Sequence, residues 1–585
     1  MKRRILALLM VAVMLFSMAA CAEPSNGNNQ LLKDGTYKEV AEGNNGDVEV
    51  TMVIKNGVID SVKVTKHQES AGISDVAISR IPELIAEHQT VNVDTVSGAT
   101  NSSVAILNAA KACIEKAGGN IDDWMTPIAK ESSSGETTEL NCDVLVIGAG
   151  LTGLTSALSA AQNGADVLVL EKQAMAGGSC VLSTGIIQAA GSKLQKQNGI
   201  DDSPEKYYDD MMKLTEGKRE KAQVDMVTKH SGETIDWLMD NGVEFYDKVI
   251  QGVGSTAFRA HVTSPDASGL VKGLVNSLDK AGVDIMLETP VKEFIQNADG
   301  RITGAKAVDK EGNEIIVHAK NTVLASGGYT ANTEMLAKYW GEEYANAIYG
   351  SSPGVTGEMI EAAEAAGAKL VGMDVVIPGS PSVDTEKHQV VTTLTLSGGG
   401  IFVNTDGERF CNETADGWAI TSSVRNAGDY VYEIFDSTVR QDVYKVESYI
   451  KQGIVGEAAT IEELSEKISV PVENLKATID AYNTAAKGNA PDPLGREMFV
   501  KPMENPPYYY IKVTSGLVLT HGGVVINEKG QVLKEDGSVL EGLYAGGECT
   551  GGYRAFGYVC GDANAHAAVT GKIAGENAAK SATVE

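Results

Sequence analysis

Three glycines and an acidic residue form the most informative chemical pattern in the 585-residue chain. Gly148, Gly150 and Gly153 follow a strand-like run, and Glu171 ends the next strand-like run. Glycines allow a sharp turn and a close backbone approach to a pyrophosphate at a helix N-terminus, and an acid about 20 residues later can accept hydrogen bonds from ribose hydroxyls. The spacing and the flanking strands therefore predict a dinucleotide site.

The residues that follow Glu171 favour a flavin over a nicotinamide cofactor. Lys172 leads into a run of small residues at 175–179, and a second small-residue run lies at 183–185. Small residues let the backbone and the Ser and Thr hydroxyl groups lie against an isoalloxazine ring. At this point the sequence resembles the flavoprotein subunits of the fumarate reductase and succinate dehydrogenase family.

Two later glycine motifs strengthen this resemblance. Residues 322–329 contain Gly327 and Gly328, and residues 542–552 contain Glu548. In the family, the first motif returns the chain to the dinucleotide and the second brings an acid to the ribityl chain. The resemblance implies non-covalent FAD, held by Gly148, Gly150, Gly153, Glu171, Lys172, Gly177, Gly178, Ser179, Gly185, Gly327, Gly328, Glu548 and Gly561.

The resemblance also implies the fold class. We expect an α/β protein in which a FAD-binding Rossmann-like domain carries an inserted α+β clamp, or lid, domain and is preceded by a small α+β FMN-binding domain. The expected segments are a signal peptide at 1–20, a tether at 21–33, the FMN-binding domain at 34–122, a linker at 123–140, the FAD-binding domain at 141–372 and 520–585, and the clamp at 373–519.

The FMN site is predicted by the motif Asp94-x-x-Ser97-Gly98-Ala99-Thr100. The motif precedes a helical pattern, and a helix N-terminus favours the charge of a phosphate. It resembles the FMN-binding domain in which FMN is attached through its phosphate to the last threonine. The resemblance implies covalent FMN on Thr100, with Ser97, Gly98 and Ala99 beside it and a flavin transferase as partner. A turn with a helix cap is the structural alternative.

The N-terminal residues have the pattern of a bacterial lipoprotein signal. Lys2, Arg3 and Arg4 precede an apolar run that ends near Phe16, and small residues lead to Cys21. The run is too short to span a membrane comfortably. We expect lipidation of Cys21 and a location on the extracytoplasmic face of the cell membrane, held by the lipid anchor alone. An unprocessed N-terminal anchor is the alternative.

Composition argues against several other kinds of function. The formal net charge of −29 disfavours nucleic acid as a partner, because phosphate contacts need clustered Lys and Arg. The seven cysteines stand at unrelated spacings, so neither a metal site nor a haem site is expected. The expected electron donor is a membrane carrier, either a quinol or a flavin-based chain.

The expected chemistry is hydride transfer from the flavin to an activated alkene, with a protein acid protonating the other carbon. The family's cationic pocket is missing, and burying two carboxylates without paired cations is costly. We therefore expect a small neutral or singly charged enone or enoate as substrate, not fumarate. The positions that carry Glu, Arg or His in fumarate reductases align with residues 378–380, Thr393, Leu396, residues 417–418, Leu519 and Tyr558.

Three residues remain as catalytic candidates. Tyr558 and His521 could donate a proton to the carbonyl or to carbon, and Arg554 could meet one carboxylate. The alternatives are that Tyr558 packs against the isoalloxazine and that His521 is a structural histidine near the flavin edge. Arg440 and His261 are assigned to the scaffold.

Four functions are compatible with these residues. The FMN motif and the signal peptide favour an extracytoplasmic reductase that passes electrons from a membrane carrier through FMN and FAD to a C=C bond. The alternatives are a ketosteroid-type dehydrogenase, a urocanate or fumarate reductase whose carboxylate clamp aligns differently, and a non-catalytic electron-transfer lipoprotein.

Overall fold

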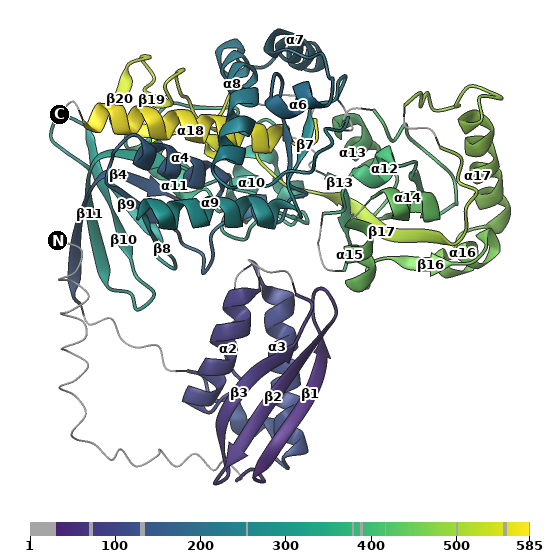
Figure 1. The fold of residues 1–585 in the computed structure, drawn as a ribbon, viewed down its shortest axis with the longest axis horizontal. Coiled ribbons are helices and arrows are strands. Elements are labelled where there is room, and N and C mark those ends of the chain that lie inside the picture. Colours follow the sequence, from purple (N-terminus) through teal and green to yellow (C-terminus); the bar gives the residue numbers. More distant parts are fainter. Residues whose placement is uncertain are drawn as a thin grey trace.

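The computed structural model describes residues 31–69, 74–96, 98–128, 135–252, 255–376, 380–386, 390–415, 417–443, 445–498, 501–553 and 559–583. Four predicted site residues, Cys21, Ser97, Arg554 and Tyr558, lie outside these ranges. The described chain forms an N-terminal domain, a main domain and a clamp domain (Figure 1). None of its described helices is long and apolar enough to cross a bilayer.

The N-terminal domain packs two helices on a three-stranded antiparallel sheet of order β1-β2-β3. Asn56 and Gly57 join β2 to β3 with left-handed backbones, φ 54° and 78°, as expected of a two-residue hairpin. Alternate residues of β2 are fully buried and face the helices. Its elements are β1 (Gly35–Glu42), β2 (Asp47–Lys55), β3 (Val58–Lys66), α2 (Asp75–His88), α3 (Thr100–Lys116) and η1 (Ile121–Trp124).

The main domain is built on an eight-stranded sheet in which β20, β11, β4, β5 and β8 lie side by side and parallel. Its strands are β4 (Thr137–Ile147), β5 (Val167–Leu170), β6 (Ile186–Gln188), β7 (Ala260–Val262), β8 (Asp284–Met286), β9 (Val291–Gln296), β10 (Ile302–Val308), β11 (Glu314–Leu324), β12 (Leu370–Val371), β18 (Gly523–Val524), β19 (Gln531–Leu533) and β20 (Val539–Ala545). Its helices are α4 (Leu151–Gln162), α5 (Gly178–Val181), α6 (Lys193–Gln197), α7 (Pro204–Leu214), α8 (Lys221–Asp240), α9 (Ala267–Ala281), α10 (Thr333–Trp340), η2 (Glu342–Tyr344), α11 (Glu358–Ala365), η3 (Gly547–Cys549) and α18 (Asp562–Ala582).

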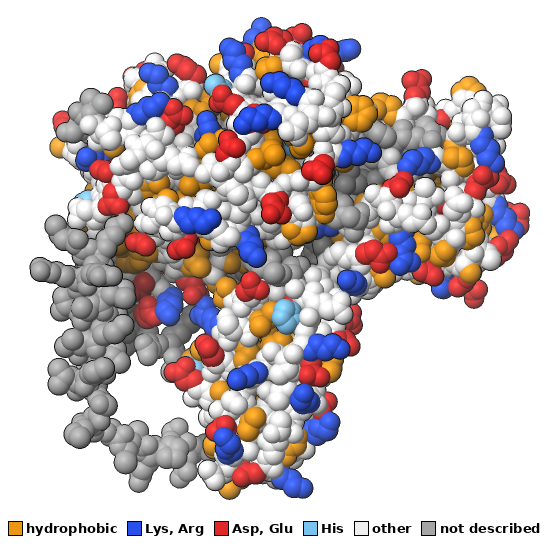
Figure 2. Space-filling model, in the orientation of Figure 1, with side chains coloured by type: hydrophobic (Ala, Val, Ile, Leu, Met, Phe, Trp, Pro, Cys, Tyr) orange, Lys and Arg blue, Asp and Glu red, His pale blue; other side chains and the backbone are white. Residues whose placement is uncertain are grey.

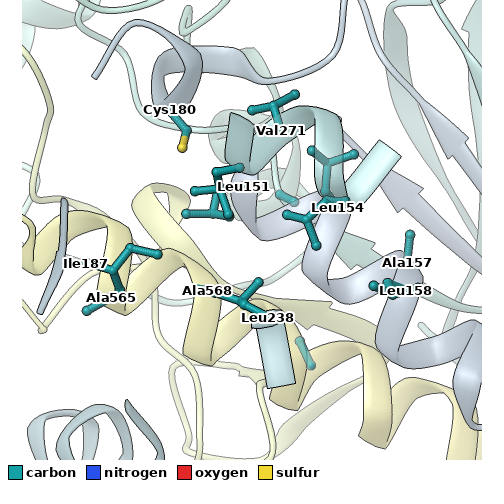
Figure 3. Close-up of a cluster of buried hydrophobic side chains, with 14 of the residues drawn as sticks. Leu151, Leu154, Ala157, Leu158, Cys180, Ile187, Leu238, Val271, Ala565 and Ala568 are labelled. Carbon is teal, nitrogen blue, oxygen red and sulfur yellow. The ribbon is translucent and has the colours of Figure 1, made fainter. Parts of the chain in front are cut away.

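Helix α4, which follows the glycine turn, is held by the C-terminal helix α18. Leu151 and Leu154 of α4 share one buried cluster with Ala565 and Ala568 of α18 (Figure 3). The two helices approach closely, since a Cβ added at Gly575 would lie 2.0 Å from the Ser156 carbonyl oxygen. The last helix of the chain therefore fixes the first helix of the dinucleotide site.

The clamp domain is an insertion in the main domain. The chain leaves after β12 and returns before β18, and these two strands pair. The clamp sheet has the order β13-β17-β15-β14, with β16 on β17, and helices surround it (Figure 1). Its elements are β13 (Ser380–Asp384), β14 (Ile401–Val403), β15 (Val431–Asp436), β16 (Gly456–Ala458), β17 (Tyr508–Gly516), α12 (Leu394–Ser397), α13 (Gly417–Asn426), α14 (Ser437–Asp442), α15 (Lys445–Lys451), α16 (Ile461–Ile468) and α17 (Val472–Ala486).

The predicted segments differ from the structural elements by a few residues at the linker. Trp124 is buried in the core of the N-terminal domain, two residues beyond the expected end at 122. Strand β4 begins at Thr137 because its first residues pair with β11, whereas the main domain was expected from 141.

On the face shown in Figure 2, Asp and Glu side chains are interspersed with Lys and Arg.

Candidate functional site

A cavity of about 260 Å³ lies between the main domain and the clamp domain. The glycine turn after β4, the end of β5 and the turn after β11 form the main-domain walls. Residues beside β13 and α12 form the facing wall. Nine of the thirteen residues predicted to hold FAD line this cavity: Gly148, Gly150, Glu171, Lys172, Gly178, Ser179, Gly327, Glu548 and Gly561.

The glycine turn leaves the N-terminus of α4 open to the cavity. Gly148 has a left-handed backbone, φ 101°, and a Cβ added at Gly150 would meet nothing within 4 Å. Gly153 is needed for close packing, because its added Cβ would lie 1.8 Å from the Gly148 carbonyl oxygen. No side chain caps the amides at the start of α4. This open cradle fits a pyrophosphate.

Glu171 lies at the end of β5 with only 6% of its surface exposed. Its carboxylate accepts hydrogen bonds from the Ala149 amide at 2.7 Å and the Gln173 amide at 2.8 Å. Burial raises the pKa of Glu171 despite these bonds. The carboxylate is thus fixed beside the glycine turn, where ribose hydroxyls of a dinucleotide would lie.

Four of the residues predicted to hold FAD do not line the cavity but pack behind its walls: Gly153, Gly177, Gly185 and Gly328. A Cβ at Gly185 would lie 2.1 Å from the Thr263 hydroxyl, and one at Gly328 would lie 2.3 Å from the Glu548 carboxylate. Gly177 pairs with Gly150 in an isolated bridge. Two buried oxygens at the cavity, Ser326 Oγ and Gln173 Oε1, have no hydrogen-bond partner among the described residues. Bound FAD can supply the hydrogen-bond partners that these two oxygens lack, and the open glycine turn can hold its pyrophosphate.

The clamp end of the cavity is lined by hydroxyl and apolar side chains. Ser380, Thr392 and Thr393 lie there, together with Leu519 from the segment between β17 and β18. The charged residues in the described lining, Glu171, Lys172, Glu358 and Glu548, all come from the main domain. Lys172 is paired with Glu358 at 2.5 Å. The described clamp wall therefore offers no Lys, Arg or His to a bound anion.

His521 is not among the residues that line the cavity. His521 is 2% exposed and lies between β17 and β18, whereas its neighbour Leu519 lines the cavity. Arg554 and Tyr558 lie outside the described residues, so their roles stay predictions. Arg440 contacts Glu447 and the Tyr509 hydroxyl, as expected of a scaffold residue.

His261 is also a buried scaffold residue. Its ring lies 2.7 Å from the Ser192 hydroxyl and 2.8 Å from the Arg259 carbonyl oxygen. Burial lowers the pKa of His261 to about 4, so the ring is neutral near pH 7. A neutral histidine outside the cavity lining does not serve as its acid.

Several wall residues could not be assigned from the sequence. Thr184, Cys560 and Asn564 also line the cavity. Burial raises the pKa of the Cys560 thiol, and hydrogen bonds with Thr393 and Thr184 oppose that rise. Thr184 and Cys560 stand next to Gly185 and Gly561, so adjacency to a motif glycine was the available signal.

Thr100 is exposed and begins α3, a helix of 17 residues. Gly98 has a left-handed backbone, φ 86°, and Ala99 provides no side-chain cap for the helix. The N-terminal amides of α3 are thus open to a phosphate, and the Thr100 hydroxyl lies beside them. This geometry fits a phosphate held at the predicted residues Gly98, Ala99 and Thr100.

The N-terminal domain contacts both other domains near this motif. A Cβ at Gly98 would lie 3.2 Å from the Met175 sulfur, and Ala174 packs against the core of the N-terminal domain. The Asn45 side chain accepts a buried hydrogen bond from Gln452 of the clamp domain at 2.9 Å. Figure 1 shows one end of α2 and α3 directed at the other two domains.

Comparison with known proteins identifies both flavin modules. A family described as the FAD binding domain matches residues 143–563, and the FMN-binding domain matches residues 43–115. These matches confirm the predicted fold class, the FAD-binding domain and the FMN-binding domain.

Relatives of known activity share this organisation. The NADH:acrylate oxidoreductase of Vibrio harveyi is 32% identical over 93% of this chain, which spans 61% of that relative. The urocanate reductase of Eggerthella lenta is 29% identical, with 92% of this chain and 91% of the relative covered. A flavocytochrome c3 fumarate reductase in an open conformation superposes with a TM-score of 0.65 and 28% identity, covering 76% of this chain and 79% of its own.

Proposed function

Because the chain belongs to the FAD binding domain family, with the fumarate reductase and succinate dehydrogenase flavoproteins, we propose that it reduces the C=C bond of a small organic acceptor. The observation that carries this proposal is a continuous cavity that joins the FAD cradle to the clamp wall. Bound FAD supplies hydride chemistry. The chain holds the acceptor beside it and excludes water.

The acceptor is a neutral or singly charged enone or enoate, such as an aryl acrylate. The described clamp wall carries hydroxyl and apolar side chains and no cation, so a second carboxylate would be buried unpaired there. Thr392, Thr393 and Ser380 can instead donate hydrogen bonds to one carbonyl or carboxylate. The acrylate and urocanate relatives reduce monocarboxylates by name, which supports this class.

A substrate panel tests this choice. We expect the anaerobically reduced protein to be reoxidised rapidly by cinnamates, acrylate or neutral enones, and at least about tenfold more slowly by fumarate, because one unpaired buried charge costs several kcal/mol. Flavin absorbance measures the rate. Rapid reoxidation by fumarate would contradict the wall argument and favour a dicarboxylate reductase. Oxidation of a saturated ketosteroid by the oxidised protein would favour the dehydrogenase alternative.

Electrons reach FAD from FMN covalently attached to Thr100. The segment at 173–179 supports this route, since Gln173 and Ser179 line the FAD cavity while Ala174 and Met175 contact the N-terminal domain. One short segment thus separates the two flavin sites. A flavin transferase attaches the FMN, and a quinol or flavin-based membrane carrier reduces it.

The protein is a lipid-anchored enzyme on the extracytoplasmic face of the membrane. The basic start, the short apolar run and Cys21 support this location. A Cys21→Ser variant is expected to move from the membrane fraction to the soluble extracytoplasmic fraction. Retention of the variant in washed membranes would contradict lipid anchoring at Cys21.

A further inference from the structure

Glu433 is a fully buried acid in the centre of the clamp sheet. It lies on β15, opposite Phe402 of β14 and Ile511 of β17. None of the ion pairs among the described residues includes it, and neither of these cross-strand neighbours can hydrogen-bond to it through its side chain. A carboxyl in such a place is costly unless it is neutral or well hydrogen-bonded.

The Glu433 carboxyl joins the two segments of the clamp wall from behind. One oxygen lies 2.8 Å from the Ser382 hydroxyl on β13, and the other forms a short hydrogen bond with the Thr395 hydroxyl on α12. Ser382 follows the cavity residues Ser380 and Pro381, and Thr395 follows Thr392 and Thr393. The Ser382 carbonyl also accepts a hydrogen bond from the Val391 amide at 2.9 Å.

The hydrogen bonds fit the neutral form of this carboxyl. The Thr395 hydroxyl lies 2.7 Å from the Thr392 carbonyl oxygen, which can only accept. A hydroxyl has one proton, so Thr395 can donate either to Glu433 or to the Thr392 carbonyl. A proton on Glu433 lets both bonds form at once, with Thr395 donating to Thr392 and accepting from Glu433.

The charged surroundings favour the same form. Burial raises the pKa of Glu433, the hydrogen bonds with Thr395 and Ser382 lower it, and the negative charge of Glu413 raises it further. The result is a pKa of about 7. The nearby guanidinium groups of Arg409 and Arg496 contact Glu413. Tyr449, the other titratable neighbour, is buried with a raised pKa and stays neutral.

We propose that neutral Glu433 is the positioning residue of the substrate wall. It holds the Ser380–Pro381 and Thr392–Thr393 segments in the arrangement that binds the acceptor. Its ionisation draws the Thr395 proton to the carboxylate, which breaks the bond from Thr395 to the Thr392 carbonyl and loosens that arrangement. The proposal rests on the proposed function of the cavity. It makes substrate affinity, and not hydride transfer itself, depend on pH.

The test compares Glu433→Gln with Glu433→Leu. In the wild type, KM for the acceptor should rise by up to about tenfold per pH unit above pH 7, with a smaller change in kcat. Gln keeps both bonds, because its amide donates to Thr395 and its oxygen accepts from Ser382, so KM should match the wild type at pH 6 and stay flat to pH 9. Leu removes both bonds and should raise KM about tenfold at every pH. Glu457→Gln, at an exposed glutamate on β16, is the control and should keep the wild-type profile.

Three outcomes would overturn the proposal. If KM of Glu433→Gln rose with pH as it does in the wild type, another group would be responsible for the pH dependence. Loss of kcat at unchanged KM in the Gln variant would make Glu433 a proton donor. A Leu variant equal to the wild type would remove any role for the carboxyl.

A second readout does not depend on turnover. The pKa of Glu433 is raised from its ordinary 4.5 to about 7, so its contribution to stability is fully present below pH 4.5 and is lost as pH rises to about 7. The Tm of the flavin-free wild type should fall across this window relative to that of Glu433→Gln. Parallel Tm curves would overturn the proposal, whereas absence of any alkene reduction with diverging Tm curves would overturn the proposed function alone.

Discussion

Thr100→Val removes the proposed attachment site of FMN and is expected to abolish reduction of the acceptor by membrane or reduced-flavin donors. The hydroxyl at the start of α3 is the group that would form the phosphoester, and Val cannot replace it. We expect at least about a 100-fold loss of donor-driven turnover, because the entry cofactor is absent. Turnover driven by reduced methyl viologen, which reduces FAD directly, should persist.

The matched control is Thr36→Val, an exposed strand threonine of the same domain. This variant should retain one protein-bound flavin after acid precipitation, whereas Thr100→Val should retain none. Covalent FMN in the Thr100 variant would contradict the assignment. So would full donor-driven turnover without FMN.

Gly150→Val is expected to abolish FAD binding without unfolding the protein. Its backbone, φ −71° and ψ −177°, is open to valine, and a Cβ would extend into free cavity space. When FAD binds, the added methyl groups would occupy the place of the pyrophosphate. We expect FAD affinity to fall at least about 100-fold, because the backbone can no longer approach the phosphates.

Two comparisons separate this effect from general damage. The flavin-free variant should unfold within about 2 °C of the flavin-free wild type, because a Cβ at this position meets nothing within 4 Å and the valine methyl groups extend into the cavity. Gly150→Ala should lose less affinity than Gly150→Val. Wild-type FAD affinity in the Val variant, measured by flavin fluorescence, would exclude the N-terminus of α4 as the pyrophosphate site.

The FAD cradle could be predicted from sequence because its determinants are local. Gly148, Gly150 and Gly153 fix one turn, and strand alternation with Asn56-Gly57 fixes the hairpin of the N-terminal domain. Such features depend on a few neighbouring residues, whose allowed backbone angles are known in advance.

The clamp wall could not be predicted in the same way, because it depends on contacts between distant segments. The side chains of Asn45 and Gln452, 407 positions apart, meet at a domain contact. Glu433 lies behind the cavity wall because of the order in which the clamp strands pair, and that order is set by contacts between distant segments. Between β17 and β18, Leu519 lines the cavity and the buried His521 does not, a difference that the local sequence does not determine.

The central claim is that electrons pass from FMN through FAD to a C=C bond, and a single-turnover titration tests it most directly. Each reduced flavin holds two electrons, so the fully reduced wild type should convert about two molecules of a cinnamate or enone, and Thr100→Val about one. Product counts and flavin absorbance give both values. A wild type that converts about one molecule and keeps its FMN reduced would contradict the electron route, and a protein that reduces no alkene on the panel would contradict the proposed function.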